Sequence, residues 1–143
     1  MDMKLELVPV PVSDVDRAKA FYVDRVGFNA DHDTRFGETA RVVQLTPPGS
    51  ACSIVIGTGL GEISEMRPGS VKALHLVVAD VSKMRKALAA RGVAVGEVEE
   101  HGRGVKFVHF SDPDGNTWAV QQLKVRGDNP LIPPEHRGRF GAP

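Results

Sequence analysis

The sequence predicts an α+β protein built from two βαβββ repeats. Asp14 and Asp80 each begin a helical pattern, and Gly49 and Gly115 each lie in a turn 35 residues further on. Asp80 follows Asp14 by 66 residues, Gly115 follows Gly49 by the same number, and the same order of elements lies between them. A constant offset over two pairs of landmarks indicates that one fold unit has been duplicated. A position in one repeat can therefore be compared with its counterpart in the other.

The first repeat covers about residues 4–57. Residues 4–12 alternate as a strand does, although their two prolines each remove a backbone donor and limit the pairing. Asp14 is a suitable N-cap, and apolar residues then recur at helical spacing as far as Gly27, which suits the C-terminal cap. Three strand patterns complete the repeat, at about residues 28–35, 39–46 and 51–57.

The second repeat covers about residues 71–123 and follows a linker, 58–70, that holds three glycines and a proline. A strand is predicted over 71–79, and Asp80 caps a second helix that Gly92 ends. Further strands are predicted near residues 94–99, 104–110 and 117–123. The tail, 124–143, is rich in proline, glycine and basic residues, so we expect it to be extended and docked or disordered. We expect residues 1–143 to form a single domain.

Composition excludes several classes of partner. Eighteen basic and eighteen acidic residues give a net charge of zero, which argues against nucleic acid or a membrane surface. The apolar runs are far shorter than the roughly 20 residues of a membrane span, and no signal-peptide pattern opens the chain. One cysteine excludes an internal disulfide framework. We therefore expect a cytoplasmic protein whose main partner is a small molecule.

Two motifs carry a resemblance to a known family. The first helix reads Val-Ser-Asp-Val-Asp-Arg-Ala-Lys-Ala-Phe-Tyr and ends in Val-Gly-Phe, and the late turn reads Phe-Ser-Asp-Pro-Asp-Gly-Asn-Thr-Trp. With two βαβββ units over about residues 4–123, these motifs resemble the vicinal oxygen chelate superfamily of glyoxalases, bleomycin-resistance proteins and extradiol dioxygenases. The resemblance implies the glyoxalase/bleomycin resistance/dihydroxybiphenyl dioxygenase-like fold, in which each sheet curves into a half-barrel with a ligand pocket on its concave side. It does not fix the reaction.

The resemblance also implies where a metal would bind. Metal-using members carry His, Gln or Glu on the first strand, seven residues before the capping aspartate, and on the last strand, four residues after the turn glycine. These positions are Leu7 and Ala73 on the first strands, and Ser53 and Ala119 on the last strands. Three are apolar, and a lone serine hydroxyl is a poor ligand. We therefore expect no metal and no other cofactor here.

Residues of the same parity as these positions should line the concave side, because strand side chains alternate. The resulting set is mostly apolar with a few polar points, as in small-molecule sites. It comprises Leu7, Pro9, Pro11, Ala51, Ser53, Val55, Ala73, His75, Val77, Thr117, Ala119 and Gln121. We predict ligand contacts at Leu7, Pro9, Ser53, His75, Thr117 and Gln121, and at Arg103 from the loop 99–104.

Two of these residues have alternative interpretations. His75 is either a general base or hydrogen-bond donor to a ligand, or a half-buried strand residue that a backbone carbonyl satisfies. Arg103 either meets an anionic ligand group as its loop closes over the pocket, or lies in a solvated hairpin.

Other chemically reactive or aromatic residues have plainer interpretations. The parity of Trp118 and the helical position of Tyr22 place both in the core, and Cys52 is predicted to be a buried, inert thiol. The acidic pair around Pro113 belongs to a turn. His109 and Arg41 are ambiguous strand residues.

Three functions are consistent with these observations. The first is a metal-free binding protein of the bleomycin-resistance type that sequesters a small aromatic or cationic compound. The second is a glyoxalase-like lyase or isomerase, catalytic through His75 without metal or through an unrecognised metal site, so whether the chain is an enzyme stays open. The third is a regulatory or scaffold module that acts through its basic tail. A homodimer is expected in each case, because the family completes its pockets across a symmetric interface and the edge strand 4–12 needs protection.

Overall fold

The first repeat forms one four-stranded sheet in the order β1-β4-β3-β2, in a computed structural model that describes residues 1–137. Strand β1 runs parallel to β4, and the other neighbours are antiparallel. Its elements are β1 (Leu7–Pro9), α1 (Val15–Ala20), a π-helical segment η1 (Phe21–Val26), β2 (Asn29–Phe36), β3 (Ala40–Thr46) and β4 (Ser53–Thr58).

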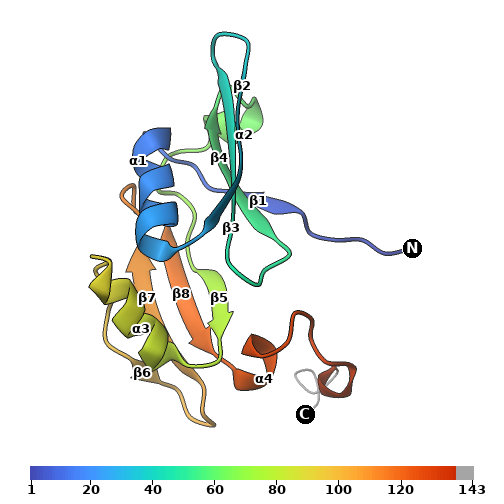
Figure 1. The fold of residues 1–143 in the computed structure, drawn as a ribbon, viewed down its shortest axis with the longest axis vertical. Helices are drawn as coiled ribbons and strands as arrows, with labels where there is room; N and C mark the ends of the chain where they lie inside the picture. Colours follow the sequence, from blue (N-terminus) through green and yellow to red (C-terminus); the bar gives the residue numbers. More distant parts are fainter. Residues whose placement is uncertain (138–143) are drawn as a thin grey trace.

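The second repeat has the same topology, with the order β5-β8-β7-β6 and a parallel β5-β8 pair. Its elements are β5 (Leu74–Val78), α3 (Val81–Ala90), β6 (Glu99–Glu100), β7 (Lys106–Ser111) and β8 (Thr117–Gln122). Figure 1 shows the two sheets one above the other, with α1 beside the junction and α3 beside the second sheet. The predicted α+β fold of two βαβββ units is confirmed.

Both predicted N-caps are present. The Asp14 carboxylate accepts from the amide of Arg17, and the Asp80 carboxylate accepts from the amide of Lys83. The first helix differs from expectation in its second half, where it widens into the π-helical segment before Gly27 ends it with φ of 98°. Only glycine adopts this left-handed conformation without a steric penalty.

Four other segments differ from the sequence-based expectation, and the first is the strand predicted over 4–12, which is reduced to β1. The strand predicted over 94–99 is reduced to β6, because Val93 and Val95 pack on the core as a loop and only the amide of Gly96 bonds to β7, at the carbonyl of His109. The linker contains a short helix, α2 (Glu62–Glu65). The tail contains α4 (Lys124–Gly127) and a 3₁₀ turn (Pro134–His136) where an extended or disordered chain was expected. Residues 138–143 lie outside the described part of the chain.

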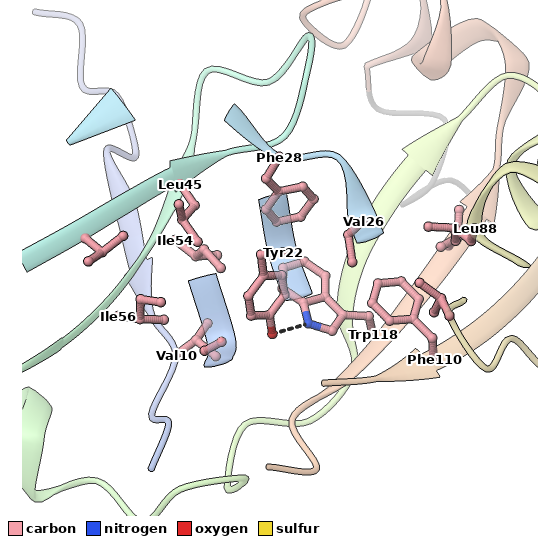
Figure 2. Packing of buried hydrophobic residues seen from close by; sticks show 14 of the residues in the cluster. Val10, Tyr22, Val26, Phe28, Leu45, Ile54, Ile56, Leu88, Phe110 and Trp118 are labelled. Atoms are coloured by element: carbon pink, nitrogen blue, oxygen red, sulfur yellow. Dashed lines mark hydrogen bonds between the residues drawn. The ribbon is translucent and has the colours of Figure 1, made fainter. Parts of the chain in front are cut away.

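The core joins the two repeats through aromatic side chains (Figure 2). Tyr22 is fully buried, stacks on Phe28 at 5.5 Å between ring centroids and lies 5.8 Å from Trp118. The indole Nε1 of Trp118 donates to the Tyr22 hydroxyl at 3.0 Å. The predictions that Tyr22 and Trp118 belong to the core are confirmed, and this pair ties the first helix to the last strand.

A buried carboxylate completes the junction. Asp112, 5 % exposed, accepts from the Tyr22 hydroxyl at 2.8 Å and from the Asn116 side-chain amide at 2.7 Å. Its other oxygen accepts from the amides of Asp114 and Asn116, both at 2.9 Å. Burial, and next the Asp112 charge, raise the pKa of Tyr22, so the phenol stays a donor. The Asp112 motif thus has the predicted turn role and also anchors α1.

Arg41 has a structural role on the helix-facing side of β3. Its guanidinium, nearly buried, makes two bonds of 2.9 Å to the Asp33 carboxylate and one of 2.7 Å to Asp16. Hydrogen bonds from Arg41 and Lys19 hold the pKa of Asp33 well below its usual range. The network fastens α1 to β2 and β3.

No helix in residues 1–137 is both long and apolar enough to cross a membrane.

Candidate functional site

The two sheets pair their first and last strands in different registers. Leu7 pairs with Ser53 in the first sheet. The 66-residue offset would pair Ala73 with Ala119, but His75 takes that place in the second sheet. Because the shift is two residues, the side of the sheet that each residue faces is unchanged. His75, and not Ala73, is therefore the structural counterpart of Leu7. It pairs with Ala119 on the last strand as Leu7 pairs with Ser53.

Ala73 explains the shift. It lies just before β5 in the left-handed region, with φ of 57°, which costs free energy for a residue with a Cβ atom. Two side chains hold it there: its amide donates to the Thr117 hydroxyl at 2.7 Å, and its carbonyl bonds to His75 Nδ1 at 2.6 Å. The predicted ligand contacts Thr117 and His75 thus also fix the start of β5.

The bond to Ala73 determines the tautomer of His75. A carbonyl oxygen only accepts, so Nδ1 carries the proton and donates. Nε2 of the neutral ring then holds a lone pair, and the side chain is exposed. His75 is therefore bonded to a backbone carbonyl, as one sequence interpretation proposed, yet it is open to solvent with a basic nitrogen available, as the other requires.

Three imidazoles surround one phenyl ring on the open face of the second sheet. The ring centroid of Phe107 lies 6.0 Å from that of His75, 5.3 Å from that of His101 and 6.2 Å from that of His109. His75 and His109 both pair with the small residue Ala119, on its two sides. We call these four rings the histidine cluster. It presents π faces and edges to solvent rather than an aliphatic surface.

Glu99 lies next to two imidazoles of the histidine cluster. Its carboxylate lies 2.9 Å from His109 Nδ1 and 3.8 Å from His101 Nε2. The neighbouring Arg103 sits at the tip of the loop with φ of 55°, between two glycines, and is exposed. Gln121 is half-buried and pairs with both Val77 and Phe107, so it lies at the edge of the cluster.

The open face of the first sheet is covered by its own polar side chains. Ser53 is 5 % exposed, and its hydroxyl bonds to Gln44 at 3.1 Å and to Thr46 at 2.7 Å. Gln44 also donates to Glu6, and Thr46 donates to Asp31. Leu7 and Pro9 lie on this sheet, half-buried. Of the predicted contacts, Leu7, Pro9 and Ser53 are therefore on one sheet, and His75, Thr117, Gln121 and Arg103 belong to the other repeat.

Two hollows adjoin the second sheet. A cavity of about 770 Å³ lies beside β5 and is lined by the N-terminal arm, the β3–β4 turn, β5, α3 and the segment after α4. A shallower hollow of about 510 Å³ lies beside β7 and includes His109 and Thr117. His75 lines the larger one. Cys52 also lines it, half-buried rather than fully buried as predicted, and burial raises the pKa of its thiol.

The positions at which the sequence resemblance implies metal ligands supply few donors. Leu7 and Ala119 have none, and the Ser53 hydroxyl is already engaged. His75, brought in by the register shift, adds one nitrogen. Residues 1–137 contain no group of three or more His, Cys, Asp or Glu side chains placed to hold a metal ion. A divalent cation in a protein needs three or four converging ligands.

Two βαβββ repeats, each folded into a four-stranded sheet, define the structural class of the chain. The model of the Glyoxalase/Bleomycin resistance protein/Dioxygenase superfamily matches residues 4–120, and the chain belongs to this family. TnmS3, an antibiotic binding protein from Streptomyces sp. CB03234, is 36 % identical, with a TM-score of 0.72 over 85 % of this chain and 96 % of that one.

Two further proteins are similar to this chain over most of its length. A glyoxalase/bleomycin resistance protein from Streptomyces sp. CB03234 is 37 % identical, with a TM-score of 0.70, covering 83 % of this chain and 100 % of that one. YetH of Bacillus subtilis (strain 168) is 28 % identical over 126 residues, which are 85 % of this chain and 100 % of YetH. The family expected from the sequence motifs is confirmed.

Proposed function

We propose that the chain binds a small organic molecule on the open face of the second sheet, as a sequestering protein. The observation that carries this proposal is the histidine cluster, whose imidazole rings are exposed around the small Ala119. Exposed rings gathered on one face are costly for solubility unless they serve recognition. The 36 % identity to a protein described as antibiotic binding supports the same function.

The cluster favours a flat, conjugated ligand. Rings of Phe107 and His109 lie nearly parallel, with 11° between their planes, and His75 and His101 stand edge-on to Phe107. A planar ligand can stack on such faces and accept contacts from such edges. The lone pair of His75 Nε2 would accept from a ligand hydroxyl or amide, and Gln121 offers both a donor and an acceptor.

Binding is proposed to need no metal. Leu7 and Ala119 bring no donor atoms, and Ser53 is used within the protein. A chelator is therefore expected to leave the affinity unchanged, whereas a protein that holds its ligand through a cation would lose it.

Replacing His75 by alanine is expected to weaken binding of a planar aromatic antibiotic by about three- to tenfold, the range of one aromatic contact. Titration calorimetry against a panel of such compounds, daunorubicin among them, measures the dissociation constants with and without EDTA. His32→Ala, an exposed histidine on the first sheet, is the matched control and should bind as the unaltered chain does. Equal affinities for all three proteins would contradict a site around His75.

A glyoxalase-like lyase or isomerase is the second candidate, because the fixed tautomer of His75 leaves Nε2 as a base. The same variant separates the two functions. In an enzyme, His75→Ala would abolish turnover of an α-hydroxycarbonyl or hemithioacetal substrate. In a binding protein, no turnover is expected from either protein.

We propose that two copies complete the site. Within residues 1–137, β1 pairs only with β4 and β5 only with β8, so each sheet keeps an open edge. Met1, Met3 and Leu5 are exposed on an arm that projects from the body in Figure 1. Carboxylates of Glu6 and Asp31 lie on the first open face and histidines on the second. A two-fold dimer that sets unlike faces together would cover both.

Sedimentation equilibrium at micromolar concentration is expected to give about twice the 15.4 kDa chain mass. Deleting residues 1–6 should shift the protein toward monomer and weaken ligand binding in parallel, because the arm and Glu6 are lost together. A monomeric mass for the full chain in the presence of saturating ligand would contradict the shared site.

A further inference from the structure

The cavity of about 770 Å³ beside β5 has walls of one sign of charge. The chain has as many acidic as basic residues, 18 of each, yet none of the described residues that line this cavity is acidic. Lys4, Arg91 and Arg126 line it, together with His75. A neutral protein has thus gathered cationic side chains around one apolar space.

The rest of the lining is largely apolar. Val26 and Phe28 come from the end of the first helix, Met84 and Leu88 from α3, and Leu131 from the segment after α4. A volume of several hundred cubic ångströms with mostly apolar walls and a few polar groups is typical of small-molecule sites. The cavity therefore combines an apolar interior with cationic groups.

Arg91 is held in place by the protein. Its Nε donates to the carbonyl of Arg25 at 2.7 Å, and one terminal nitrogen, Nη2, donates to the carbonyl of Val26 at 3.2 Å. No described residue pairs its charge with a carboxylate, and Nη1 has no hydrogen-bond partner in residues 1–137. The guanidinium lies over Gly27, a cavity residue, at 3.6 Å from where a Cβ atom would be. Such a fixed, uncompensated cation can bind an anion with little loss of side-chain entropy.

Arg126 is placed by a close approach of the chain. Gly127, in α4, lies so near the backbone of Val78 and Ala79 that an added Cβ atom would come within 2.5 Å of it. This contact fastens α4 to the end of β5 and sets Arg126 at the cavity, where Nη1 bonds to the carbonyl of Asn129 at 2.6 Å. Two arginines from separate elements thus border the same space.

We propose that this cavity binds an amphipathic anion, a molecule with an apolar body and a carboxylate, sulfonate or phosphate group. The apolar body fills the space between α3 and the end of the first helix, and the anionic group meets Arg91 and Arg126. The site lies apart from the histidine cluster except for His75, and it does not depend on the sequestering function proposed above.

The test compares three ligands that share one tail. Decanoate, decan-1-ol and decylamine differ only in the charge of the head group, and calorimetry on the full chain gives their affinities. Decanoate is expected to bind at least about tenfold more tightly than decylamine, with decanol between them, because a charge-assisted hydrogen bond replaces a charge repulsion. Equal affinities, or no binding by any of the three, would overturn the proposal; the latter would mean that another part of the protein or a second copy fills the cavity.

Substitutions test whether the charges of the two arginines bind the anion. Arg91→Gln and Arg126→Gln should each weaken decanoate binding by about five- to tenfold, and Arg91→Lys should keep most of the preference for the anion. Arg85→Gln is the matched control and should change nothing, because Arg85 lies in α3, just before Arg91, and pairs with Glu97 instead. His109→Ala alters the histidine cluster alone, so unchanged decanoate binding there separates this site from the one proposed above. An equal loss in Arg85→Gln would overturn the assignment.

The reactivity of the single cysteine tests whether decanoate binds in this cavity. Cys52 lines the cavity and is half-buried, so its alkylation by a maleimide should slow as decanoate saturates, with the same midpoint as the calorimetric titration. Decylamine at the same concentration should give little protection. Decanoate binding without protection of Cys52 would overturn the proposed site.

Discussion

Asp112→Asn is expected to lower the free energy of unfolding by about 3 kcal/mol, because an asparagine cannot accept what the carboxylate accepts. Four donors point at the two oxygens of Asp112: the Tyr22 hydroxyl, the Asn116 side-chain amide and two backbone amides. An asparagine has one oxygen and one NH₂ group, so in either orientation a donor faces two donors in a buried site. Removing the charge lowers its desolvation cost, but two lost bonds with buried partners outweigh that gain.

Urea denaturation measures the change, and thermal unfolding should show a loss of roughly 6–12 °C at this chain length. Asp24→Asn is the matched control: Asp24 is exposed on the same first helix as Tyr22 and should change stability by less than about 0.5 kcal/mol. If the two variants are equally stable, the hydrogen bonds of Asp112 do not join the repeats.

The fold could be predicted because its signals are local and repeated. Asp14 and Asp80 cap their helices through their own side chains, and the buried residues of β3 alternate as its sequence does. The exceptions depend on the tertiary environment. Val93 and Val95 have strand-like sequence but pack as a loop on the core, and the widening of the first helix at Tyr22 brings its ring to Phe28 and Trp118.

The candidate site was predictable in part. Parity predicts that His75, Thr117 and Gln121 lie on one side of the second sheet, and the strand pairing agrees, because a strand exposes alternate residues whatever its register. The pairing of His75 with Ala119 was not predictable from the offset of 66. It depends on the left-handed Ala73 and its two side-chain partners. Phe107 was missed. Its parity with His109 on the same strand is the signal that would have found it.

Gly69→Ala is expected to cost about 3 kcal/mol, for two reasons that can be separated. Gly69 lies in the linker with φ of 80°, where any residue with a Cβ atom loses about 1–2 kcal/mol. An added Cβ atom would also lie much closer to the Asp114 carbonyl oxygen than van der Waals contact allows. That contact is with backbone, so the linker or the turn must move.

Gly49→Ala isolates the backbone strain. Gly49 has φ of 82° and nothing within 4 Å of its Cβ position, so it should lose only about 1–2 kcal/mol. The difference between the two variants, measured by urea denaturation, is the free energy of the close contact between the linker and the Asp114 turn. That turn also accepts the amide and hydroxyl of Ser13, at 3.1 and 2.5 Å. Displacing it should therefore loosen the start of α1, and hydrogen exchange there should rise in Gly69→Ala alone. Equal losses in both variants would mean that the linker merely spans the repeats and adds nothing to the contacts that hold them together.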